Sequence, residues 1–168
     1  VFRPDGARLC EAVASFIRTG VCDANAGGVV VVMDGGSASS IVATLAVEAL
    51  DPDRVYGLVL PSSKLGSRSA QDAEAVAEAL EIERDTIHLQ PLLMCFADAV
   101  PDGTDLHGDP IARENLVARL RMAMAYLVAN ATDRLVVGSA TRTERLLGSV
   151  AKFGDGAADL LPLGGLYG

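Results

Sequence analysis

Apolar residues along the chain follow two alternating patterns, which together predict strands that alternate with helices. Short runs rich in apolar and β-branched residues predict strands; these are residues 29–33, 54–60, 85–91 and 134–139. Apolar residues spaced at helical intervals predict helices; these are residues 4–19, 39–50, a stretch from residue 69, residues 109–130 and a short stretch from about residue 142. Residues 91–108 show no regular pattern. This order predicts an α/β fold, a doubly wound and mainly parallel sheet with helices on both faces, in a single domain over residues 1–168.

The same spacing predicts which side chains of the helices face the core. The expected inward positions are Leu9, Val13, Phe16 and Ile17 in the first helix, Ile41, Leu45 and Ala49 in the second, and Leu116, Leu120, Ala123, Met124 and Leu127 in the long one. Gly20 is expected to end the first helix, and Asp109 with Pro110 to begin the long one.

The segment Asp34–Ser39, which joins a predicted strand to a helix, is the first candidate for ligand binding. In doubly wound folds, ligands bind at the carboxyl ends of the strands. Gly35 and Gly36 allow close backbone approach, and Ser39 supplies a hydroxyl where a helix begins and where anions are attracted. The segment has neither the GxxxxGK[ST] nor the GxGxxG pattern. Phosphate binding and a simple tight turn both remain open.

Further polar residues follow later in the chain. Asn115 and Arg119 share one face of the long helix, which is either a ligand contact or a solvated surface. Glu144, three residues after Thr141, fits a capping box and is also a candidate metal ligand. Lys152 is one of two lysines, and the nearby Asp155 is flanked by glycines.

Composition excludes several classes of function. The net charge of −8 argues against a nucleic-acid partner. The apolar runs are too short for a membrane span, and the first residues do not resemble a secretory signal, so a cytoplasmic location is expected. The three cysteines are expected to be buried thiols rather than a disulfide framework or zinc site.

From about Val29 to the C-terminus the chain resembles a known family, most specifically in three segments. The segments "ARLRM", "VVGSATRTE" and "KFGDGAADLLPLGGLY" occur in this order. They resemble the ammonia-dependent NAD synthetase family, which belongs to the adenine nucleotide α-hydrolase-like group of N-type ATP pyrophosphatases. The resemblance implies a homodimeric ligase of NAD biosynthesis that joins ammonia to deamido-NAD, with ATP and Mg²⁺ as cofactors.

The resemblance also implies roles for particular residues, all of them contacts to small-molecule nucleotides or to the metal. ATP would contact Asp34, Gly35, Gly36, Ser37, Ser39 and Ser139, magnesium would bind Glu144, and deamido-NAD would contact Arg119, Lys152 and Asp159.

The sequence departs from the family's pattern at three positions. The family's loop pattern is Ser-Gly-Gly-x-Asp-Ser, whereas Asp34 replaces the first serine and Ala38 replaces the aspartate expected to hold magnesium. Gly168 stands where the family has a lysine that contacts ATP, and the C-terminal segment that follows in the family is expected to be absent. One hypothesis is a ligase whose magnesium is held by Asp34 and Glu144. The alternative is a non-catalytic paralogue that binds a nucleotide or a protein partner, and a third is another member of the same fold group with a different substrate.

Overall fold

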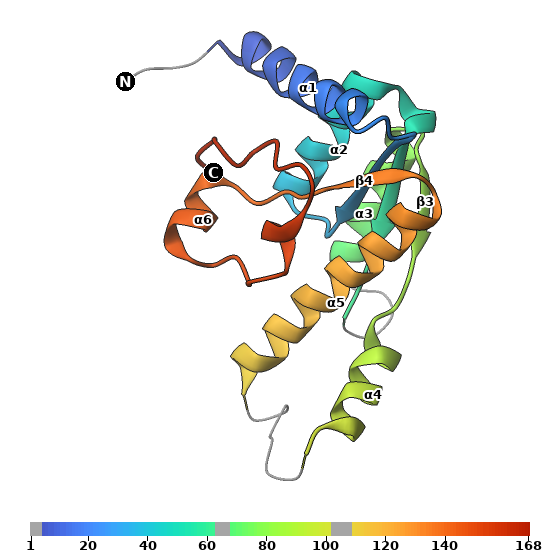
Figure 1. Ribbon diagram of the computed structural model, residues 1–168, viewed down its shortest axis with the longest axis vertical. Coiled ribbons are helices and arrows are strands. Elements are labelled where there is room, and N and C mark those ends of the chain that lie inside the picture. The colour runs from blue at the N-terminus through green and yellow to red at the C-terminus, as the bar shows by residue number, and fades with distance from the viewer. Residues whose placement is uncertain (1–4, 63–67, 102–108) are drawn as a thin grey trace.

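The protein is built on a parallel four-stranded sheet. The computed structural model describes residues 5–62, 68–101 and 109–168. The strands are β1 (Gly28–Met33), β2 (Val55–Val59), β3 (Glu83–Thr86) and β4 (Arg134–Val137), and they lie in the order β3-β2-β1-β4. The helices are α1 (Gly6–Asp23), α2 (Ser37–Leu50), α3 (Arg68–Ala79), α4 (Gln90–Ala99), α5 (Pro110–Ala131) and α6 (Arg142–Leu147), and Pro52–Arg54 and Asp155–Ala157 form single 3₁₀ turns, η1 and η2 (Figure 1).

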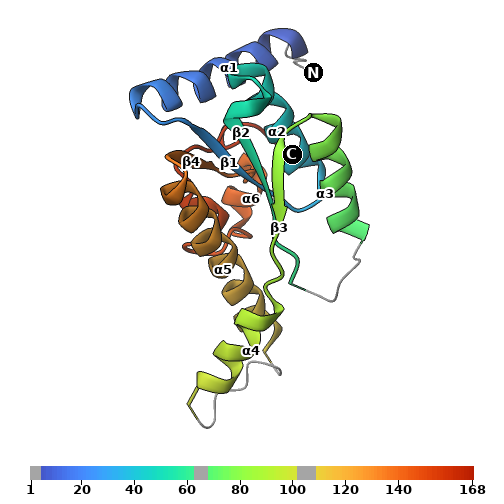
Figure 2. The same cartoon turned by 90° about the vertical axis from the view of Figure 1, so that its right-hand side faces the viewer.

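Both faces of the sheet are covered by helices, as the sequence predicts. Side chains of a strand alternate between faces, so Val29 and Val31 join a core with α1, α2 and α3. Val30, between them, packs with α5 and with Leu93 of α4 on the other face. Figures 1 and 2 show α4 and the first half of α5 extending beyond the sheet.

The strand order places a topological switch point at β1. The chain proceeds from β1 outward to β2 and β3, and β4 then pairs with the other side of β1. The connection from β1 to β2 runs through α2 on one face of the sheet, and the connection from β3 to β4 runs through α5 on the other face. This divergence leaves a crevice at the carboxyl ends of β1 and β4, where such folds bind ligands.

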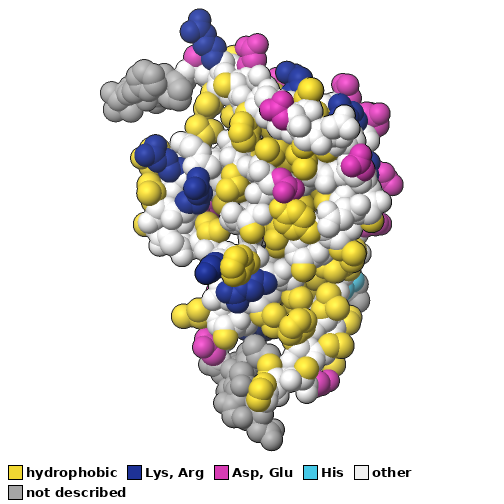
Figure 3. Space-filling view, viewed as in Figure 1, with side chains coloured by type: hydrophobic (Ala, Val, Ile, Leu, Met, Phe, Trp, Pro, Cys, Tyr) yellow, Lys and Arg dark blue, Asp and Glu magenta, His cyan; other side chains and the backbone are white. Residues whose placement is uncertain are grey.

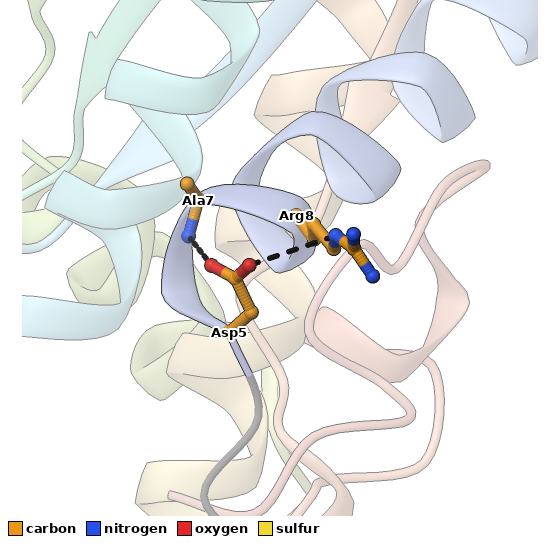
Figure 4. A network of polar contacts seen from close by, with 3 residues as sticks. All are labelled: Asp5, Ala7 and Arg8. Atoms are coloured by element: carbon orange, nitrogen blue, oxygen red, sulfur yellow. Dashed lines mark hydrogen bonds and ion pairs between the residues drawn. The ribbon is translucent and has the colours of Figure 1, made fainter.

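Helix α1 differs from its predicted bounds. Asp5 caps its start, because one carboxylate oxygen accepts a hydrogen bond from the Ala7 N–H at 3.1 Å and the other lies 3.6 Å from Arg8 (Figure 4). The helix continues through Gly20 instead of ending there. A Cβ at Gly20 would lie 2.7 Å from a methyl group of Leu160, so the glycine serves close packing rather than termination.

The third predicted strand is present, but its predicted bounds of 85–91 are wrong. Strand β3 is Glu83–Thr86, and all four of its residues are exposed. Pro91 lies in the first turn of α4, a position that tolerates proline because the first helical N–H groups have no partner within the helix. Residues 90–99 thus form a helix, although no regular apolar pattern in the sequence predicts one there.

Several predicted core positions are also wrong. Phe16, Ile41 and Leu127 are exposed, as are all three cysteines. In α5 the buried residues are Val117, Leu120, Met122, Ala125 and Ala129. Apolar residues also occupy exposed positions of this helix, such as Leu127, so their spacing does not define one inward face. Among the described residues, no helix is both long and apolar enough to cross a membrane.

Candidate functional site

Two neighbouring cavities lie at the carboxyl ends of the strands. The larger, the α5 cavity, has a volume of about 530 Å³; its lining includes Asn115, Arg119, Arg121, Glu144, Lys152 and Asp155. The smaller, the β2 cavity, has a volume of about 280 Å³ and lies between the ends of β1 and β2 and the start of α3; its lining includes Asp34, Leu60, Ser62, Ser69 and Arg121.

The loop after β1 is held by the carboxylate of Asp34. Its Oδ1 accepts hydrogen bonds from the Gly36 N–H at 2.8 Å and from the Ser39 hydroxyl at 2.6 Å. Ser39 is buried and Asp34 is exposed. A bound anion at a helix start uses backbone N–H and hydroxyl donors of this kind. Asp34 therefore already occupies two donors that a phosphate would need.

Gly35 fixes the path of this loop. Its φ is +80°, in the region that favours glycine, and a Cβ there would lie 2.1 Å from the carbonyl oxygen of Ser69. The loop consequently packs directly against the start of α3, which borders the β2 cavity. Ser37, on the other side of the loop, lines a separate apolar cavity beneath α1 together with Gly168.

Glu144 forms the predicted capping box at the start of α6. Its Oε2 accepts hydrogen bonds from the N–H of Thr141 at 2.8 Å and from its hydroxyl at 2.6 Å, and the Glu144 N–H donates to the Thr141 hydroxyl at 3.3 Å. Glu144 also lines the α5 cavity. Glu144 can therefore cap the helix through Oε2 and still bind a metal through Oε1, because Oε1 has no hydrogen bond to another described residue.

The carboxylates of the site could hold a magnesium ion only with few ligands from the protein. Among residues 5–62, 68–101 and 109–168, no group of three or more acidic, histidine or cysteine side chains lies close enough to hold a metal ion. Mg²⁺ is often held by one or two carboxylates together with substrate phosphates. Glu144 fits this role as a single ligand, whereas Ala38 offers no ligand.

Arg119 and Lys152 bring two positive charges to the α5 cavity. The Arg119 Nε donates a hydrogen bond to the carbonyl oxygen of Lys152 at 3.0 Å, which holds the segment after α6 against α5. Asn115 lies one turn before Arg119 on the same face and lines the same cavity. This face of α5 therefore borders a cavity.

Asp159 has a different setting from Arg119 and Lys152. Its carboxylate accepts hydrogen bonds from the Tyr126 hydroxyl at 2.9 Å and from the Val136 N–H at 2.8 Å, and it is not part of the lining of the α5 cavity. Burial of Tyr126 and its bond to Asp159 raise the pKa of this phenol to about 12.

Ser139 is half-buried in the turn after β4, and its neighbour Ala140 lines the α5 cavity.

Two residues of the site, Asp155 and Arg121, received no role from the sequence. Burial, followed by the negative charges of Asp34 and Glu144, raises the pKa of Asp155, while the positive charge of Arg121 lowers it. The flanking glycines were the only signal for Asp155. Arg121 lies in the same "ARLRM" segment as Arg119, but its position alone did not indicate that it lines both cavities.

A parallel sheet with helices on both faces and cavities at its switch point defines the chain as a doubly wound α/β protein. Comparison with known proteins identifies its family. The sequence model of the NAD synthase family matches residues 9–168, and the chain belongs to that family.

Individual relatives agree with this assignment. The NH(3)-dependent NAD(+) synthetase of Methanosarcina mazei is 44% identical over 156 residues, which are 92% of this chain and 60% of that protein. The structure of the NH3-dependent NAD synthetase from Campylobacter jejuni, in complex with the nitrate ion, matches with a TM-score of 0.90 and 30% identity, over 98% of this chain and 69% of that one. The NMN synthetase of Francisella tularensis matches with a TM-score of 0.89 and 33% identity, over 98% of this chain and 66% of that one. The chain thus spans 60% of the length of its Methanosarcina relative, and the predicted family and fold class are confirmed.

Proposed function

We propose that the protein acts in the ATP-dependent amidation of deamido-NAD by ammonia. The observation that carries this proposal is the pair of adjoining cavities at the switch point, one bordered by the loop after β1 and the other by Arg119 and Lys152. Relatives named as NH(3)-dependent NAD(+) synthetases support the choice of reaction. In this assignment the nucleotide of ATP enters the β2 cavity and the nicotinate half of the acid enters the α5 cavity.

The reaction has two steps that such a site must serve. A carboxylate oxygen of the acid attacks the α-phosphorus of ATP, and pyrophosphate leaves with the electron pair of the broken P–O bond. The nitrogen of ammonia then attacks the acyl carbon, and AMP leaves with the electron pair of the C–O bond. One proton must leave the nitrogen. We assign its acceptance to Asp155, since its pKa is raised and it lines the α5 cavity.

Two positively charged groups, Arg119 and Lys152, orient the anionic acid in this scheme. Magnesium, when bound, supplies positive charge that stabilises the departing pyrophosphate. Glu144 is the residue that would hold it, with phosphate oxygens as the remaining ligands.

A second candidate function is nucleotide binding without catalysis. The observation in its favour is Asp34, whose carboxylate uses the Gly36 N–H and the Ser39 hydroxyl. A carboxylate about 4 Å from a phosphate charge costs about 1 kcal/mol in water and about 4 kcal/mol at an effective dielectric constant of about 20. This repulsion weakens binding of the triphosphate without closing either cavity.

Calorimetric titration with ATP–Mg²⁺ and with deamido-NAD, followed by an assay of NAD formation, distinguishes the two candidates. The ligase requires that both ligands bind and that NAD forms. Binding of deamido-NAD without turnover at any magnesium concentration supports the non-catalytic candidate. Failure of both ligands to bind contradicts both.

The Asp34→Ser variant tests the role of this carboxylate directly. We expect ATP–Mg²⁺ to bind it at least about fivefold more tightly than the wild type, because about 1 kcal/mol or more of repulsion is removed. Asp34→Asn is the matched control, since it removes the charge while keeping a hydrogen-bond acceptor. Unchanged ATP affinity in both variants would show that Asp34 does not oppose the phosphates.

The similarity to a structure named NMN synthetase supports a further choice of acid. Nicotinate mononucleotide lacks the adenylate half of deamido-NAD. Amidation of both acids in parallel assays therefore shows whether the protein requires that half.

We also propose that the protein forms a homodimer through α4 and α5. Met94 is 58% exposed and Ile111 is 71% exposed. A cavity of about 450 Å³ lies between the two helices, with Met94 and Leu116 in its lining. Figure 3 shows apolar side chains over this part of the molecule. A second copy of the chain would remove this apolar surface from water.

A further inference from the structure

The α5 cavity and the β2 cavity share one described residue, Arg121. It lies near the middle of α5 and is half-buried. Arg119 and Lys152, the other positive charges discussed above, line the α5 cavity alone. Arg121 is therefore the described cation at the junction of the two cavities.

The position of the Arg121 side chain is fixed by the end of β2. Its Nε donates a hydrogen bond to the carbonyl oxygen of Leu60 at 3.2 Å. This bond uses the inner nitrogen of the guanidinium group. The two terminal nitrogens make no hydrogen bond to another described residue, so their N–H groups are available for a ligand.

The charges around Arg121 are mainly negative. Asp34 lines the β2 cavity with it, and Glu144 and Asp155 line the α5 cavity. Arg121 is close enough to Asp155 to lower the pKa of this carboxyl, against the raising effects of burial, Asp34 and Glu144. An anion that enters the junction would therefore meet its strongest attraction at Arg121.

The chemistry of the proposed reaction determines which anion belongs there. In an acyl adenylate, a single phosphoryl group joins the acid to the adenosine. If the two halves lie in the two cavities, that group lies where the cavities meet. Arginine suits it, since its terminal N–H groups form paired hydrogen bonds with phosphate oxygens.

We propose that Arg121 binds the α-phosphoryl group of the nucleotide, before and after pyrophosphate departs. This proposal rests on the proposed function, because it takes the nucleotide and the acid to occupy the two cavities. It differs from the roles implied for the loop after β1, which concern the whole triphosphate. Arg121 would also supply a positive charge to the phosphate. The family's lysine that contacts ATP cannot do so in this chain, because Gly168 replaces it.

Comparison of AMP with adenosine isolates this contact, since the two ligands differ only in the phosphoryl group. Calorimetric titrations at low ionic strength would measure both dissociation constants for the wild type, Arg121→Gln, Arg121→Lys and Arg8→Gln. Arg8 is an exposed arginine on α1 that belongs to neither cavity lining, and its removal changes the net charge by the same amount.

We expect the wild type and Arg8→Gln to bind AMP at least about tenfold more tightly than adenosine. In Arg121→Gln this ratio should fall to near one while the affinity for adenosine stays within about twofold. Arg121→Lys should keep part of the preference, because lysine retains the charge without the paired N–H groups.

The ratio separates the possible failures. A preference for AMP that persists in Arg121→Gln overturns the role of Arg121 and leaves the proposed function standing. Equal affinities of the wild type for AMP and adenosine also overturn the role of Arg121 and leave the proposed function standing. Absence of binding of either ligand to the wild type overturns the nucleotide site itself, and with it this proposal. A loss of adenosine and AMP affinity in equal proportion in Arg121→Gln preserves the ratio and also counts against the proposal.

Discussion

At the scale of single residues, Asp155 stands where a negative charge is unfavourable. It is partly buried, and the negative charges of Asp34 and Glu144 oppose its ionisation. Such perturbed carboxyls concentrate at functional sites, because the same environment that destabilises the charge makes the group a better proton acceptor. The cost is expected to appear in the stability of the fold.

Replacement of Asp155 by asparagine should stabilise the protein at neutral pH. Because the pKa is raised above its ordinary value of 3.8, the folded protein binds more protons than the unfolded chain between these two pKa values. Stability therefore falls as pH rises through that window. The advantage of Asp155→Asn should be complete above the window and vanish below about pH 3.8. Urea denaturation at a series of pH values measures it.

The exposed Asp72 of α3 provides a matched control. Asp72→Asn removes the same charge and should change the urea midpoint little at any pH. An Asp155→Asn variant that is no more stable than the wild type at pH 7 would show that the environment of Asp155 does not disfavour its charge.

At the scale of elements, the loop between β1 and α2 is constrained by Gly35. A side chain there would adopt an unfavourable positive φ and would meet the carbonyl oxygen of Ser69. The left-handed conformation alone costs an alanine about 1–2 kcal/mol, and the backbone contact adds to it.

Gly35→Ala should therefore lower the free energy of unfolding by about 2 kcal/mol or more. Gly165→Ala is the control, since a Cβ at Gly165 has no atom within 4 Å. The two variants can be compared by urea denaturation. Equal stability would mean that the loop shifts away from α3 at little cost.

The elements also show what the sequence can and cannot reveal. Strands β1 and β2 were predictable because they are buried on both faces and consist almost entirely of apolar residues. Strand β3 lies at the edge of the sheet with four exposed polar residues, so it has no apolar signal. The faces of α5 were not predictable because apolar residues also occupy its exposed side, as Leu127 shows with 62% exposure.

The candidate site was predictable only in part, for a similar reason. Motifs indicated Arg119, Glu144 and Lys152, which the fold does bring to one cavity. The side chain of Arg121 is positioned by the carbonyl oxygen of Leu60, which follows strand β2 and lies sixty-one positions earlier in the chain. Contacts between such distant segments leave no pattern in a single sequence.

At the scale of the whole molecule, the exposed apolar surface of α4 and α5 leads to a prediction about assembly. Met94→Asp should convert the proposed dimer to a monomer, because a charge would be buried at the interface. Analytical ultracentrifugation measures the mass. Ile41→Asp, on α2 at the opposite face of the sheet, should leave it unchanged. A wild-type protein that is monomeric throughout would contradict the proposed interface.

The contact of Asp159 with β4 has a consequence for how the sheet meets solvent. An uncovered strand edge is a template for pairing with another chain and so for aggregation. At β4, Asp159 accepts the outward Val136 N–H, and Leu160 exchanges backbone hydrogen bonds with Val136 and Gly138. At the other edge, β3 presents the charges of Glu83, Arg84 and Asp85. One margin is thus covered by the chain itself and the other is guarded by charge, so Asp159, whatever it binds, also helps to keep neighbouring molecules apart.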